Sequence, residues 1–258
     1  MNHGDSMLIA SANQKGGVGK STVIRNLALM RAAAGYKVAI IDADDDQNTL
    51  DKWYTRREDF KMIENADYNG RLIMITEDSD LLSGAIGQAK KLGCDTIMVD
   101  LPGRAVTPMA EMLLKADHCL CPLSASSDDY DVLPYMGKLL VKAKKYNEDV
   151  KLLVIHNKSN SNEKRRKLER EDLAYQCSQS EGLDLLTIDF RSAVAFQDAA
   201  KYGLALFEYA KLKSSGLTDK SHNIVAFYQL YQLLWKEKWV SVKEESVIES
   251  KEELVEEA

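Results

Sequence analysis

Residues 7–22 read MLIASANQKGGVGKST, and this stretch decides the fold. An apolar run is followed by a glycine-rich loop and then by a segment of helical periodicity. Such a loop between a strand and a helix lets backbone N–H groups surround phosphate oxygens at the positive end of the helix. Lys20 would supply a counter-charge, and the Ser21 hydroxyl would be a ligand for Mg²⁺. The stretch therefore predicts a phosphate-binding loop after the first strand.

Short runs rich in Ile, Val and Leu alternate with segments of helical periodicity along most of the chain, which is typical of a parallel sheet covered by helices. The predicted strands are Met7–Asn13, Lys37–Asp42, Arg71–Thr76, Thr96–Leu101, His118–Leu123, Lys151–His156 and Leu185–Phe190. The predicted helices are Lys20–Ala34, Leu81–Leu92, Thr107–Lys115, Asp131–Tyr146, Asn162–Ser180, Ser192–Tyr202 and His222–Lys238. This alternation predicts a single doubly wound α/β domain with a mostly parallel sheet.

The charge of the chain is distributed unevenly. The 258 residues carry a formal charge of −6, and residues 243–258 alone hold seven Glu and two Lys. The remainder is close to neutral, so the acidic balance does not exclude a basic face elsewhere. We expect residues 1–242 to form the domain. Residues 243–258 would be a solvated acidic tail or a frayed extension of the last helix.

The cysteines and the apolar runs indicate the compartment. Four scattered cysteines do not form a disulfide framework, and no signal segment opens the sequence, so we expect a reducing cytoplasm. Cys119 and Cys121 lie in an apolar run without a second pair at metal spacing, which favours buried strand positions over metal ligands. No apolar run approaches the ~20 residues needed to cross a bilayer, so we expect a soluble protein.

Two acidic strand ends complete the predicted site. Asp42 and Asp44 follow the second strand, and Asp100 ends another. Ligands of doubly wound sheets lie at the carboxyl ends of strands, so these carboxylates would face the glycine-rich loop. There they could hold Mg²⁺ or orient an attacking water, although a strand-end Asp can also cap a helix.

The loop departs from the common phosphate-binding motif, because Gln14 occupies the place of its first glycine and an additional lysine, Lys15, follows. With the string KGGVGKST at residues 15–22, the chain resembles the ParA/MinD family of deviant Walker A ATPases over about residues 7–240. It is most similar to the short ParA-type partition ATPases of plasmids. Weaker matches are DAD at 42–44, VDLPG at 99–103, and CLCP at 119–122 with Ser126 and Asp129 after it.

The resemblance implies roles for individual residues. Lys15 would reach across an ATP-bound homodimer to the partner's nucleotide, Lys20 would hold the β- and γ-phosphates, and Asp44 would position the hydrolytic water. Mg²⁺ would be held by Ser21, Asp42 and Asp100, and Asn157 would contact adenine. The implied ATP/ADP site is Lys15, Gly16, Gly17, Val18, Gly19, Lys20, Ser21, Thr22, Asp42, Asp100 and Asn157. The family usually has Pro-Gln after its second acidic residue, whereas Asp45, Asp46 and Gln47 follow here, which puts the rate of hydrolysis in question.

The resemblance also implies a surface that binds DNA without reading its sequence, through Lys and Arg. The favoured positions are Arg191, Lys201, Lys211, Lys213 and Lys220. A second run is as consistent with a solvated helix face as with DNA binding, because Glu163, Glu169 and Glu171 interrupt it. That run is Lys158, Lys164, Arg165, Arg166, Lys167 and Arg170. Aromatic residues recur at helical spacing from Phe227 to Trp239, which favours core packing over a membrane-binding helix.

Three functions fit this pattern. The first is an ATPase that segregates DNA, associates with the nucleoid, and is released by a small DNA-binding or cargo adaptor protein that stimulates hydrolysis. The second is a nucleotide-switched adaptor for conjugation or for positioning a protein cargo. The third, a metallocluster carrier, is disfavoured because no cysteine pair is placed to bridge a dimer.

Overall fold

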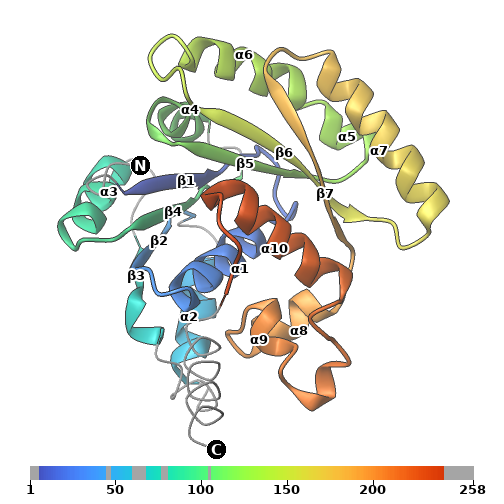
Figure 1. Cartoon of the computed structure of the whole chain (residues 1–258). Coiled ribbons are helices and arrows are strands. Elements are labelled where there is room, and N and C mark those ends of the chain that lie inside the picture. The colour runs from blue at the N-terminus through green and yellow to red at the C-terminus, as the bar shows by residue number, and fades with distance from the viewer. Residues whose placement is uncertain (1–5, 45–47, 60–67, 77–80, 104–105, 241–258) are drawn as a thin grey trace, which may run out of the picture.

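The computed structural model describes residues 6–44, 48–59, 68–76, 81–103 and 106–240 (Figure 1). Seven strands form one parallel sheet in the order β3-β2-β4-β1-β5-β6-β7. They are β1 (Met7–Ser11), β2 (Val38–Asp42), β3 (Leu72–Thr76), β4 (Thr96–Asp100), β5 (His118–Leu123), β6 (Lys151–Ser159) and β7 (Leu183–Arg191). The predicted doubly wound α/β class is confirmed.

Helices cover both faces of the sheet. Apolar residues of α3 (Leu82–Lys91), α4 (Val106–Lys115), α6 (Leu133–Ala143) and α7 (Glu163–Ser178) pack on one face. Those of α1 (Lys20–Ala33), α2 (Thr49–Asp59) and α10 (His222–Trp235) pack on the other. Figure 1 shows α4, α6 and α7 above the sheet and α1, α2 and α10 below it. Short helices α5 (Ser127–Tyr130), α8 (Ala195–Lys201) and α9 (Leu206–Tyr209) and the 3₁₀ turns η2 (Asn69–Arg71) and η4 (Lys213–Ser215) complete the described elements.

The register of the central strands places the acidic ends side by side. Every residue of β2 and β4 is buried, and Asp42 is the pairing partner of Asp100 at their carboxyl ends. β1 pairs with the other side of β4, so the loop that leaves β1 starts beside Asp100. Parallel strands buried on both faces have continuous apolar sequences, which is why these strands could be predicted.

Two local predictions, on the cysteines and on the aromatic residues, are also confirmed. Cys119 and Cys121 are buried in β5 with free thiols. Phe227, Tyr231 and Trp235 pack in the core below the sheet, so the aromatic spacing reflects core packing. Among the residues that the structure describes, no helix has both the length and the apolar character needed to cross a membrane.

The structure also contains elements that the pattern did not predict. Helix α2 buries only three side chains, those of Leu50, Trp53 and Arg57, and one of the three is charged. Two apolar positions are too few to give a clear helical periodicity. Helices α5 and α9 are four residues each, too short for a periodic signal. The predicted tail at 243–258 and the departure at Asp45, Asp46 and Gln47 lie outside the described residues.

Candidate nucleotide-binding site

The loop between β1 and α1 depends on glycine at its last position. Gly19 has a φ of 100°, in the left-handed region that favours glycine. A Cβ at Gly19 would lie 2.3 Å from Nδ2 of Asn157, which is on β6. That amide donates a hydrogen bond to the Val18 carbonyl oxygen at 2.6 Å. Asn157 therefore lies against the loop, and any side chain at position 19 would displace it.

A pocket of about 190 Å³ opens where the loop meets α1. Lys20 is buried there, and its Nζ donates to the Lys15 carbonyl oxygen at 2.8 Å. Burial lowers the pKa of Lys20, while the nearby carboxylates of Asp100 and Asp44 oppose that shift. The pocket is lined by Gly16, Gly17, Gly19, Lys20, Ser21, Thr22, Asp44, Thr49 and Gly103. A buried ammonium among loop N–H groups is a suitable environment for phosphate.

Asp100 ends β4 and contacts Ser21, which lines this pocket. Its Oδ1 accepts a hydrogen bond from Ser11 Oγ at 2.8 Å, and the Ser21 hydroxyl also bonds to its carboxylate. Burial raises the pKa of Asp100 to about 6 in spite of these bonds. A hydroxyl and a buried carboxylate form an oxygen donor set of the kind that Mg²⁺ prefers, and a cation there would favour the ionised form of Asp100.

Asp42 has a structural role at the start of α2. Its Oδ2 accepts the backbone N–H groups of Leu50 and Asp51 at 2.9 and 3.1 Å, which holds the start of α2. Its Oδ1 accepts from the N–H of Asp44 at 3.3 Å. Oδ2 therefore caps α2, the alternative considered for strand-end carboxylates, and Oδ1 holds the turn that follows β2. The assignment of Asp42 as a metal ligand stays a prediction, whereas Asp44 lines the pocket.

Lys15 does not line the described pocket. Its Nζ lies 3.4 Å from Oδ1 of Asp129 in α5, and its side chain is 30% exposed. The Asp129 carboxylate is held in turn by the N–H of Ser124 at 3.2 Å. Lys15 therefore has an ion-pair partner in its own subunit, and this pair holds the side chain beside the pocket.

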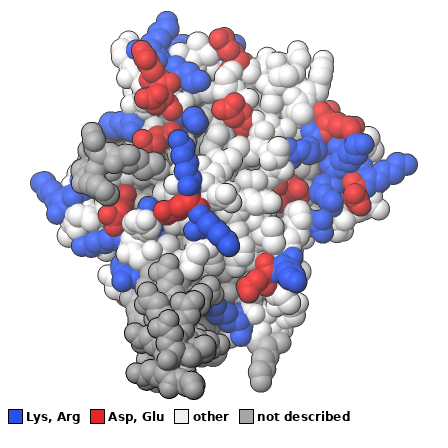
Figure 2. All heavy atoms as spheres, in the orientation of Figure 1, with Lys and Arg blue, Asp and Glu red and all other residues white. Residues whose placement is uncertain are grey.

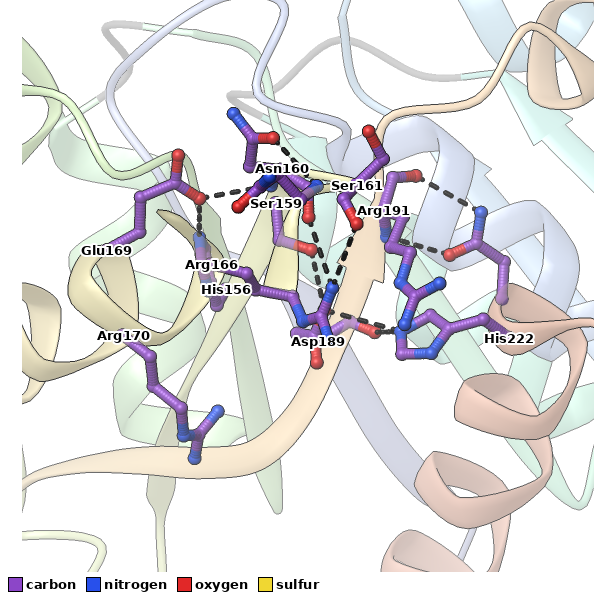
Figure 3. Close-up of polar contacts among 12 residues, drawn as sticks. His156, Ser159, Asn160, Ser161, Arg166, Glu169, Arg170, Asp189, Arg191 and His222 are labelled. Carbon is purple, nitrogen blue, oxygen red and sulfur yellow. Dashed lines mark hydrogen bonds and ion pairs between the residues drawn. The ribbon is translucent and has the colours of Figure 1, made fainter. Parts of the chain in front are cut away.

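The predicted DNA-binding positions lie in different elements. Arg191 ends β7, where its N–H donates to Asn223 Oδ1 at 2.7 Å and its carbonyl accepts from Asn223 Nδ2 at 3.1 Å (Figure 3). Lys201 pairs with Asp198 at 2.7 Å on the exposed face of α8. Lys211 lies near the Phe207 ring, and Lys220 is exposed before α10. The side chain of Lys213 lies outside the described part.

Three residues of the site were not predicted. Asn13 connects the loop to β5, because its Nδ2 donates to the Pro122 carbonyl at 2.9 Å and its Oδ1 accepts from the N–H of Lys15 at 2.9 Å. Thr49 and Gly103 line the pocket. For Asn13 the available signal was its position as a polar residue at the end of an apolar run. For Gly103 it was a glycine three residues after the strand-end Asp100.

Comparison with known proteins agrees with this geometry. The family model for ATPase MipZ matches residues 7–173. The septum site-determining protein MinD of Mesostigma viride is 48% identical over 50 residues, which span 19% of this chain and 18% of that protein.

Solved structures share the fold. The MinD cell division protein of Aquifex aeolicus has a TM-score of 0.66 at 18% identity, covering 90% of this chain and 98% of that one. A Borrelia burgdorferi B31 protein assigned to plasmid partition, bound to AMPPNP, has a TM-score of 0.59 at 15% identity, covering 90% of this chain and 99% of that one. The family match spans more than half of the chain and includes the loop and all three carboxylates, so the chain belongs to the MipZ family of ParA/MinD-like ATPases.

Proposed function

We propose that this ATPase segregates DNA as an ATP-dependent homodimer that binds DNA without sequence preference. A small DNA-binding or cargo adaptor protein would stimulate hydrolysis and release the dimer. The observation that carries the proposal is the position of Lys15, which lies beside the pocket of its own subunit rather than in it.

The pocket supports binding of ATP with Mg²⁺. Lys20 and the glycines of the loop line the space that phosphates would fill, and Ser21 with Asp100 would provide the oxygen donors for the cation. Bound Mg²⁺ would neutralise part of the phosphate charge. Asp44 lines the same pocket, which supports a role for its carboxylate in orienting the attacking water. The Borrelia burgdorferi partition structure, which has the same fold, holds AMPPNP.

Dimerisation would require Lys15 to exchange its partner. In the single chain its ammonium faces Asp129, and its side chain is partly exposed. Partly exposed ion pairs are weak, typically ~1 kcal/mol or less, so the triphosphate of a second subunit could compete for this lysine. Lys15 would then bring positive charge to the partner's nucleotide while Lys20 holds its own.

Sedimentation with ATP and Mg²⁺ tests the dimer. Wild type should form dimers, and Lys15→Ala should remain monomeric while still binding ATP. Asp129→Asn is the matched control, because it breaks the same ion pair but keeps the lysine, and it should dimerise at equal or lower ATP concentration. Dimers of Lys15→Ala would contradict the cross-subunit role.

Retention of wild type on DNA tests the segregation function. The ATP-bound protein should be retained on unrelated duplexes at low salt and released as salt rises. If ATP-dependent dimers form but no DNA is retained at any salt concentration, the DNA-segregation proposal fails. The nucleotide-switched adaptor would then describe the protein better.

A further inference from the structure

The end of β6 connects the nucleotide loop to a basic surface. Asn157, which contacts the Val18 carbonyl, is followed by Lys158 with a φ of 54°, a left-handed conformation that is rare for a lysine. The register between β6 and β7 shifts between Asn157 and Ser159. A bulge of this kind redirects side chains, and Lys158 is exposed between the buried residues Asn157 and Ser159.

The neighbouring strand ends with a second cation. Ser159 pairs with Arg191 of β7, and the N–H of Ser192 donates to the Ser159 carbonyl at 3.2 Å. Adjacent strands lie about 4.8 Å apart, so Lys158 and Arg191 belong to one narrow edge of the sheet. The two hydrogen bonds between the Asn223 side chain and the Arg191 backbone fix the backbone of Arg191.

The first turn of α7 extends this edge. Lys164 and Arg165 are exposed there, and Asn162 caps the helix by accepting the N–H of Arg165 at 3.1 Å. Figure 2 shows Lys and Arg side chains concentrated at the right of the molecule, where Figure 1 places the start of α7. Within the described ranges, Lys158, Lys164 and Arg165 form no ion pair.

Acidic groups near this edge are engaged internally (Figure 3). Asp189 accepts from Ser159 Oγ at 2.5 Å and lies 3.3 Å from His222 Nε2 and 4.0 Å from Arg166 Nε. Glu169 accepts the N–H of Asn160 at 3.0 Å and faces buried His156 at 3.6 Å.

These contacts separate two kinds of basic residue. Arg166 and Arg170 serve the fold, the latter by donating to the Leu186 carbonyl at 2.7 Å. Exposed Lys167 pairs with Glu171 at 3.9 Å. Lys158, Lys164 and Arg165 are exposed, and half-buried Arg191 lies at the end of the neighbouring strand. We name these four residues, Lys158, Lys164, Arg165 and Arg191, the β6–α7 strip. Glu163, which is exposed in the same turn, only partly offsets their charge.

We propose that the β6–α7 strip binds the sugar–phosphate backbone of duplex DNA, an inference that rests on the proposed DNA-segregation function. Exposed Ser161 and Ser192 accompany the cations, and hydroxyl groups with Lys and Arg are the usual partners of DNA phosphates. The contact of Asn157 with the loop, one residue before Lys158, gives nucleotide binding a direct route to the strip. The strip therefore provides the sequence-independent and ATP-dependent contacts that segregation requires.

Two triple alanine variants test the assignment. The strip variant replaces Lys158, Lys164 and Arg165. The control variant removes the same charge from exposed positions on and after α6, namely Lys138, Lys142 and Lys145. Affinity for a labelled duplex is measured with ATP and Mg²⁺ at several salt concentrations, and a fluorescent ATP analogue verifies that both variants bind nucleotide like wild type.

A dimer of the strip variant would lose six phosphate contacts, so the slope of log affinity against log salt should become shallower by about five. Affinity near physiological salt should fall at least tenfold, by about the same factor for unrelated sequences. The control variant should keep the slope of wild type.

Three results would overturn the assignment. Wild-type affinity in the strip variant would place the DNA contacts elsewhere, for example at Lys201, Lys211 and Lys220. Unchanged DNA binding with lost retention on polyglutamate would make the strip a site for an acidic protein. No binding of DNA by wild type at any salt concentration would remove the segregation function itself, which is a different failure from the first.

Discussion

The buried ion pair between Arg57 of α2 and Glu208 of α9 makes a contribution to the stability of the fold that can be measured. The two guanidinium nitrogens of Arg57 donate to the two carboxylate oxygens of Glu208 at 2.9 and 2.8 Å, and the side chains are only 3% and 6% exposed. Glu208 also accepts from the Tyr68 hydroxyl at 2.6 Å and from the N–H of Ala205 at 2.8 Å.

Replacing Glu208 with Gln should lower the free energy of unfolding by about 3–5 kcal/mol, because it leaves a buried guanidinium without its counter-charge. The double variant Arg57→Met/Glu208→Gln removes both charges and keeps one carbonyl acceptor for Tyr68 or Ala205. Arg57 also donates to the Gly203 carbonyl at 3.2 Å and to Asn69 Oδ1 at 2.7 Å, and the double variant removes both bonds. Its loss should be about 1–3 kcal/mol, because the acceptors left unpaired are neutral. The double variant should therefore be more stable than the single variant Glu208→Gln.

Urea unfolding followed by circular dichroism measures these differences, with the denaturant slope checked for constancy. Two results would refute the reasoning. One is a decrease in the free energy of unfolding of less than about 1 kcal/mol for Glu208→Gln, which would mean that water reaches the ion pair. The other is a double variant whose loss equals the sum of the two single losses, which would mean that the charges do not interact.

Three further predictions concern the nucleotide site. Gly19→Ala should weaken ATP binding at least tenfold in a fluorescent-nucleotide titration, and Asn157→Ala in the same chain should restore only part of it, because the φ of 100° remains. Asp44→Ala should retain ATP and persist as a dimer while phosphate release stops; release at the wild-type rate would move the water-positioning role to another carboxylate. Because the pKa of Asp100 is raised to about 6, the folded metal-free protein binds its proton more tightly than the unfolded chain, so stability should fall as pH rises from about 4 to 6 and then level off. Asp100→Asn should flatten that slope in urea unfolding with EDTA, and an unchanged slope would contradict the shift.

Local sequence signals were sufficient for the sheet and for the loop. The strands at the centre are continuous apolar runs because they are buried on both faces, and the loop is recognisable because Gly19 and Lys20 are required within one short string. The carboxylates could be placed near the loop because parallel strands end at one edge. No contact between distant residues had to be known for these predictions.

Contacts between distant residues account for what the sequence left open. Lys15 and Asp129 are 114 positions apart, and Arg57 and Glu208 are 151 apart. A charged residue in a segment with few apolar positions normally indicates a solvated surface, yet Arg57 is buried in the last turn of α2. No local pattern distinguishes such a residue from an exposed one, because its partner alone makes the burial favourable.

The two predicted DNA surfaces are connected to the nucleotide pocket through different contacts. The route to α8 and α9 passes from Asp44 to α2, whose start is held by Asp42 and whose last turn is held by the buried Arg57–Glu208 pair. A change at the pocket would have to move this clamped helix as a body before it displaced Lys201 or Lys211. The route to the β6–α7 strip passes through the single hydrogen bond from Asn157 to the Val18 carbonyl, and Lys158 follows immediately. The second route crosses no buried ion pair, so the strip is the surface more directly coupled to the loop. Replacing Asn157 should therefore remove the ATP dependence of DNA binding.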